Sequence, residues 1–152
     1  MARDYGRAIE IYQRLIEIEP SFHRAYAVLN WIYEALREYD QSIEAFQVAE
    51  NLTAEETMSL RAAYTDMGSE GYWRWMIEWY EAKRSKGYVP LSTLARVYAR
   101  SGDADAAFEI LEEAFEARDG DLAFMNAFPD WDPLRSDPRF ANLLRRMNFP
   151  GN

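Results

Sequence analysis

Residues 25–52, AYAVLNWIYEALREYDQSIEAFQVAENL, contain two amphipathic patterns separated by a polar break at residues 37–40. Apolar side chains recur in both patterns at spacings of three and four residues, which places them on one face of a helix. Because the break is short, the two helices must be antiparallel neighbours. Ser42 is small, so we expect the helices to approach closely there. The apolar positions are Tyr26, Leu29, Ile32, Tyr33 and Leu36, then Tyr39, Ile43, Phe46 and Ala49.

The same pattern recurs along the chain with a period of 34 residues. Such a period predicts a stack of helix hairpins, each of which buries its apolar face against its neighbours. Tyr5, Ala8 and Tyr12 precede Tyr39, Ser42 and Phe46 by this distance, and Leu60, Tyr64 and Gly68 precede Leu94, Tyr98 and Gly102 by the same distance.

The period and the order of aromatic, leucine and small residues resemble the tetratricopeptide repeat over residues 4–118. The resemblance implies an all-α fold, a right-handed superhelical array of antiparallel helix hairpins (an α-solenoid), with a concave groove that binds proteins. Tyr26, Leu29 and Tyr33 match the first-helix signature, Pro20 matches the terminal proline, and the pairs Ala8–Tyr12, Ser42–Phe46 and Ala107–Leu111 match the small-to-large signature of the second helix.

The predicted units are a half repeat at 4–20 and repeats at 22–52, 54–85 and 88–118. Thr53 and Glu56 form a capping-box pattern at the start of the third unit, whose first helix should end at Gly68. Trp73 stands where the pattern requires a small residue, so we expect the next helix to shift outward or change its angle. The half repeat has no first helix, which suggests either a fragment of a longer protein or an array that begins abruptly.

Residues 119–152 should cap the open end of the array, with a short helix at 121–127 and a last helix at about 138–147. The stretch 132–150, DPLRSDPRFANLLRRMNFP, resembles the C-terminal tail of many bacterial tetratricopeptide proteins. In those proteins the repeats often follow a regulatory, DNA-binding, kinase or cyclase domain.

The composition excludes several classes of function. The 152 residues include no cysteine, which rules out disulfides, thiolate zinc sites and cysteine catalysis. The net charge of −9 disfavours nucleic acid and anionic membranes as partners, and its sharper interpretation is attraction to a basic partner segment. No apolar run reaches the roughly 20 residues that span a bilayer, and no hydrophobic signal segment occurs. We therefore expect a cytoplasmic protein.

The residues offer no evident catalytic or cofactor site. His23 is the single histidine, and we expect it to be exposed or to cap a helix rather than to serve a catalytic triad. The acidic pairs at 55–56 and 112–113 fit solvated helix surfaces, and no glycine-rich phosphate loop is present. We expect no enzymatic activity, no metal and no cofactor.

What remains is an interaction surface. In the tetratricopeptide family the first helices line a groove that holds a peptide or a partner helix. We expect Trp31 to anchor an apolar side chain, and Arg96 and Arg100, one turn apart, to bind a carboxylate. The Lys and Asn clamp of chaperone-binding members is absent, because Ala27 and Trp31 occupy its lead positions. The expected groove residues are Arg24, Ala27, Trp31, Glu34, Met58, Ala62, Thr65, Ser92, Arg96 and Arg100.

A second surface is possible on the aromatic stretch 71–84, GYWRWMIEWYEAKR. Its apolar residues form two stripes, which either pack internally on both sides or leave Tyr72, Trp75 and Trp79 for a partner. Two functions follow: an interaction scaffold that binds a partner peptide or helix in the groove, or an appendage that dimerises or regulates a larger protein. A homodimer would use the aromatic stretch or the uncovered first helix.

Overall fold

The computed structural model describes residues 4–126 and 128–148, and no strand occurs among them. The fold is all-α and of the tetratricopeptide type, as predicted. The chain forms two compact units, Met1–Tyr72 and Trp73–Asn152, and each is described by itself. Ala127 and residues 149–152, which fall in the predicted short helix and cap, lie outside the described residues. Within the described part, no helix combines the length and apolarity needed to span a bilayer.

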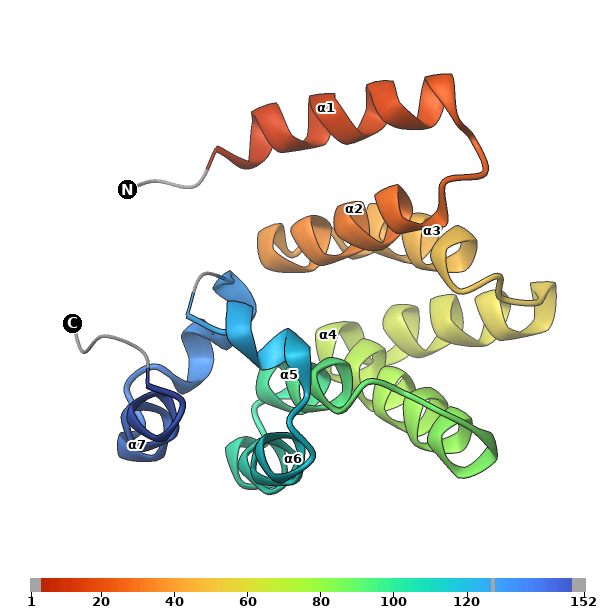
Figure 1. Ribbon diagram of the computed structural model, residues 1–152. Coiled ribbons are helices and arrows are strands. Elements are labelled where there is room, and N and C mark those ends of the chain that lie inside the picture. The colour runs from red at the N-terminus through yellow and green to blue at the C-terminus, as the bar shows by residue number, and fades with distance from the viewer. Residues whose placement is uncertain (1–3, 127, 149–152) are drawn as a thin grey trace. The chain divides into compact units, whose positions relative to one another are not determined.

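The first unit begins with three helices that lie side by side (Figure 1): α1 (Tyr5–Ile18), α2 (His23–Leu36) and α3 (Tyr39–Ala49). Asp4 caps α1, because its side chain accepts a hydrogen bond from the backbone N–H of Arg7. Helix α2 ends at Arg37, whose φ of 61° reverses the chain and starts the antiparallel α3. The hairpin predicted for residues 22–52 is therefore confirmed.

Helix α4 spans Ala54–Lys86 but has a sharp break at Gly68 (φ 60°, ψ −144°), where the sequence predicts a helix end. This backbone conformation is essentially restricted to glycine. The predicted capping box is also present. The backbone N–H of Thr53 donates to Glu56 Oε2 at 2.8 Å, and the backbone N–H of Glu56 donates to Thr53 Oγ1 at 3.1 Å.

The two arms of α4 approach each other at Gly71. A Cβ atom on Gly71 would lie 2.0 Å from the carbonyl oxygen of Ala63, so only glycine fits. The sequence pattern places the close approach at Trp73, which is buried instead, with 6% of its surface exposed. The small residue has thus moved two positions toward the N-terminus, and the bulky indole packs in the interior.

The second unit contains the hairpin of α5 (Leu91–Ser101) and α6 (Ala104–Glu116). Gly102 closes α5 with a φ of 93°, and the side chain of Asp103 caps α6 by accepting from the backbone N–H of Ala106. Leu94, Ala95, Ala107, Leu111 and Ala114 are fully buried, in the register that the repeat pattern predicts.

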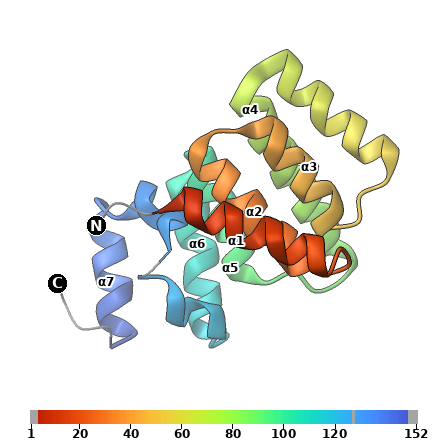
Figure 2. The ribbon, with the colours of Figure 1, turned by 90° about the horizontal axis from the view of Figure 1, so that it is seen from above.

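The chain then forms two short 3-10 helices, η1 (Gly120–Phe124) and η2 (Pro129–Leu134), and a final helix α7 (Pro138–Arg146). Helices α6 and α7 lie side by side (Figure 1, Figure 2). Their ion pairs join residues that are 34 positions apart: Arg139 with Asp105, and Arg146 with Glu112. Helix α7 is therefore placed one period after α6, and η1 and η2 occupy the place of a first helix. The proline at 133 explains why that segment is not α-helical.

Candidate functional site

The predicted groove residues of the first unit lie on α2 and on the first arm of α4. Arg24 and Ala62 are exposed, and Ala27 and Trp31 are partly exposed. Met58 has 67% of its surface exposed although its side chain is apolar. These five side chains reach solvent, so this part of the predicted surface is accessible.

Glu34 does not face solvent as the sequence analysis expects. It is 2% exposed, and its Oε1 accepts a hydrogen bond of 2.7 Å from the hydroxyl of Tyr72. Tyr72, expected at a second interface, is fully buried. The reason is the same for both residues: each polar group finds its partner inside the first unit.

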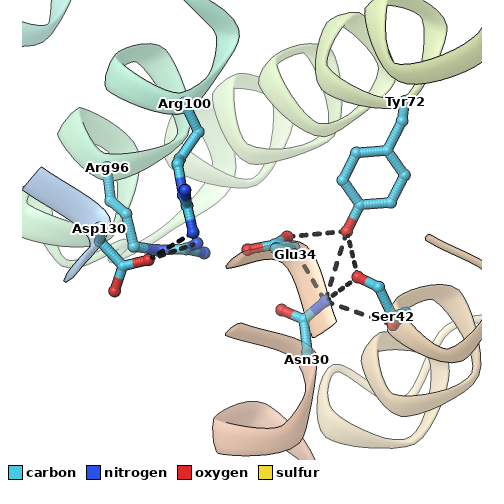
Figure 3. Close-up of polar contacts among 7 residues, drawn as sticks. All are labelled: Asn30, Glu34, Ser42, Tyr72, Arg96, Arg100 and Asp130. Atoms are coloured by element: carbon cyan, nitrogen blue, oxygen red, sulfur yellow. Dashed lines mark hydrogen bonds and ion pairs between the residues drawn. The ribbon is translucent and has the colours of Figure 1, made fainter. Parts of the chain in front are cut away.

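Glu34 and Tyr72 belong to a buried polar cluster with Asn30 and Ser42 (Figure 3). Asn30 Nδ2 donates to Ser42 Oγ at 2.8 Å, and Ser42 Oγ lies 2.8 Å from the Tyr72 hydroxyl. An ionised carboxylate only accepts hydrogen bonds, so the Tyr72 proton points to Glu34 and the Ser42 hydroxyl donates to Tyr72. Hydrogen bonds therefore run from α2 to α3, on to α4, and back to α2.

The cluster holds Tyr72 in its neutral form. Burial is the main cause of a Tyr72 pKa well above the usual value of 10, and the negative charge of Glu34 raises the pKa further. The neutral phenol is needed here, because only the neutral form can donate to the carboxylate. This arrangement stabilises the α2–α3–α4 packing and shows no feature of a reactive site.

The other two residues of the predicted second interface remain at the surface. Trp75 and Trp79 are partly exposed and stack with ring centroids 6.2 Å apart and planes 14° apart. Lys83 Nζ lies 4.8 Å from the centre of the Trp79 ring, a cation–π contact.

In the second unit, the predicted arginine pair binds a carboxylate from the same chain (Figure 3). Asp130 Oδ1 lies 3.5 Å from Arg100 Nη2 and 4.0 Å from Arg96 Nη1. The side chains of Arg96 and Asp130 are only 5% and 6% exposed. Arg96 is thus buried rather than solvent-facing, because η2 lies on the face of α5 that carries it.

Ser92, the third predicted groove residue of α5, is also buried by the C-terminal segment. Its backbone N–H donates to Asp119 Oδ2 and its hydroxyl donates to Asp121 Oδ2, both at 3.3 Å. Leu122, Met125, Trp131 and Leu134 are buried in the same segment. The segment therefore contributes carboxylates and apolar side chains together, which is the chemistry expected of a peptide bound to this face.

Sequence reasoning missed Asn30 and Asp130. Asn30 follows Leu29 at a position that is usually small in this repeat pattern, and a polar residue opposite Ser42 was the available signal. Asp130 lies 34 residues after Arg96, one repeat period later. An acidic residue at the equivalent position of the next repeat was therefore a usable clue.

His23 has the role that the sequence predicts. It is exposed, and its Nδ1 lies 2.8 Å from the carbonyl oxygen of Val48, to which it donates. The bond ties the start of α2 to the end of α3, where carbonyl groups lack partners within the helix.

Comparison with known proteins identifies one repeat directly. Residues 91–121, which contain α5 and α6, match the family model of the tetratricopeptide repeat. No curated protein and no solved structure matches the chain. Repeats of this kind are typically non-catalytic modules for protein–protein interaction. Residues 91–121 therefore form a tetratricopeptide repeat, and the chain folds as an all-α protein of that repeat type.

Proposed function

We propose that the chain is a non-catalytic interaction module that binds a partner peptide or helix on the α2 and α4 face of its first unit. The observation that carries the proposal is the difference between equivalent residues. Trp31 on α2 is partly exposed, whereas Arg96 at the equivalent position of α5 is buried against Asp130.

The exposed side chains indicate what the partner supplies. Trp31 and Met58 are large, apolar and accessible, and such residues gain the most when a partner covers them. Arg24 at the start of α2 supplies a charge at the edge. We therefore infer that the partner inserts an apolar side chain against Trp31 and Met58 and places a carboxylate near Arg24.

Affinity capture with matched variants tests the proposal. The bait is the whole chain, compared with Trp31→Ala, Met58→Ala and the control Tyr88→Ala. Tyr88 is 83% exposed but belongs to the second unit and to no predicted surface. We expect a captured protein to be lost with Trp31→Ala and Met58→Ala and kept with Tyr88→Ala. Equal retention by all four baits refutes the proposal.

A second candidate function is self-association as the appendage of a larger protein. The stacked and partly exposed Trp75 and Trp79 favour it. Sedimentation over a range of concentrations separates the candidates: a monomer at all concentrations eliminates self-association, whereas a dimer lost with Trp79→Ala supports it.

A further inference from the structure

Helices α1, α3 and α6 each stand in the second-helix position of a repeat, but one flank of α1 is open. We define this open flank by the small residue of the repeat signature and the apolar residues three and seven positions later. In α3 and α6 the equivalent positions 42, 45, 107, 110 and 114 are at most 7% exposed. The open flank of α1 consists of Ala8, Ile11 and Leu15, continued one turn further by Ile18.

The exposure of the open flank is large for apolar side chains. Ile11 is 54% exposed and Ile18 is 81% exposed, and none of the 14 residues of α1 is buried. The opposite flank of α1 faces α2, since Gln13 Nε2 donates to the Tyr33 hydroxyl at 3.4 Å. The open flank is therefore a separate surface from the one that attaches α1 to the first unit.

The same molecule shows what covers such a flank. In α3 it is covered by α2, whose Asn30 donates to Ser42. In α6 it is covered by α5, with Ala95 and Ala107 both fully buried. The flank of α1 carries Ala8 and Ile11 where α6 carries Ala107 and Ile110, so its chemistry matches α6. A helix patterned like α5, apolar with alanine at its centre, is the complementary shape.

Charge narrows the occupant further. Arg7 and Arg14 are exposed and lie one turn before and one turn after Ile11 along one edge of the open flank. Two copies of α1 packed antiparallel, with Ile11 against Leu15, would bring the two Arg14 side chains within one turn of each other on the same edge. Like charges so placed oppose pairing, which makes a second copy a poor fit.

We propose that the open flank of α1 binds an amphipathic helix of a protein partner, apolar with alanine at its centre and acidic along one edge. Ala8, Ile11, Leu15 and Ile18 form the apolar contact, and Arg7 and Arg14 select the acidic edge. This surface is distinct from the α2 and α4 face proposed above, and either can exist without the other.

Two synthetic peptides test the proposal directly. Both carry the apolar pattern of α5 with a central alanine, and they differ only in having glutamate or lysine along one edge. Fluorescence anisotropy with the whole chain should show roughly tenfold tighter binding of the glutamate peptide at low salt. The double change Arg7→Glu, Arg14→Glu should reverse this preference, because the edge then attracts lysine.

Matched variants separate this surface from the one on α2 and α4. Ile11→Ser should abolish peptide binding without lowering the Tm, since Ile11 is half exposed. Met58→Ser, at another exposed apolar residue of the first unit, should leave peptide binding unchanged. Equal affinity for the two peptides, or equal damage from Met58→Ser, overturns the proposal. A dimer of the wild type that Ile11→Ser converts to a monomer assigns the flank to a second copy instead and also overturns it.

Discussion

In the α2–α3 hairpin the central contact is polar, with Asn30 donating to Ser42, whereas the equivalent residues of the α5–α6 hairpin are Ala95 and Ala107. The two hairpins share one register, since each pair of equivalents is 65 residues apart. The first hairpin takes its polar groups into its interior and leaves Trp31 partly exposed. The second keeps its interior apolar and buries Arg96 under the C-terminal segment. The same backbone therefore presents an accessible first-helix face in one unit and a covered one in the other, depending on the residues that follow.

The largest expected effect concerns the covered face. Asp130→Asn removes the carboxylate that faces Arg96 and Arg100, and leaves buried positive charge with less compensation. The free energy of unfolding should fall by about 3 kcal/mol, as is typical when one partner of a buried ion pair is lost. Urea denaturation measures the change. Asp105→Asn, which removes an exposed partner of Arg139, is the control and should have little effect. Equal midpoints for the two variants would show that the arginine pair does not depend on Asp130.

The next effect concerns the close approach within α4. Gly71→Ala places a Cβ atom 2.0 Å from the Ala63 carbonyl oxygen, so the two arms of the helix must separate. We expect a loss of about 2 to 3 kcal/mol in the free energy of unfolding from this overpacking. Gly87→Ala is the matched control, because no atom lies within 4 Å of its added Cβ. Thermal unfolding should separate the two variants clearly, and similar Tm values would mean that α4 adapts without cost.

A smaller effect tests the polar interior of the first hairpin. Tyr72→Phe removes the donor to Glu34 and leaves the buried carboxylate with one hydrogen bond fewer. The expected loss is about 1.5 kcal/mol in the free energy of unfolding. Tyr88→Phe, at a tyrosine that is 83% exposed, should change nothing. Combining Tyr72→Phe with Ser42→Ala should cost less than the sum of the single changes, since the residues act in one cluster. Strict additivity would argue against a connected cluster.

The smallest effect is a pH dependence in the second unit. Partial burial, together with the hydrogen bond from its hydroxyl to Glu81, raises the pKa of Tyr98 from 10 to about 12. The unfolded chain therefore loses this proton first, and the contribution of Tyr98 to stability declines as pH rises from 10 to about 12. Denaturation at pH 9 and pH 11 should show a decline that is smaller in Tyr98→Phe. An identical decline in both proteins would locate the effect at other tyrosines.

The positions of the helices could be predicted because the apolar residues repeat with the period of a helix and the turns carry clear signals. The capping box at Thr53 and the break at Gly68 are local features, and both are confirmed. The site was less predictable, because the exposure of a residue depends on segments far away in the sequence. Arg96 has the same helical position as Trp31, and only the fold of residues 119–134 distinguishes a covered arginine from an exposed tryptophan.

The misplaced close approach at Trp73 has a similar cause. The pattern of the repeat family indicates which position is usually small, but it does not show where the chain can compensate. Here Gly71 provides the space two residues earlier, and the tryptophan becomes a core residue. A glycine near a violated small position was therefore the relevant signal.

The burial of Arg96 by Asp130 also fixes where the folded second unit can be cut. The last recognisable helix hairpin ends with α6 at Glu116, yet the carboxylate that satisfies α5 is supplied 14 residues later. A protease-resistant fragment should therefore extend through η2 and α7. A polypeptide shortened to the end of α6 should expose apolar surface and aggregate. For this chain, the limit of the repeat pattern and the limit of the folding unit are different residues.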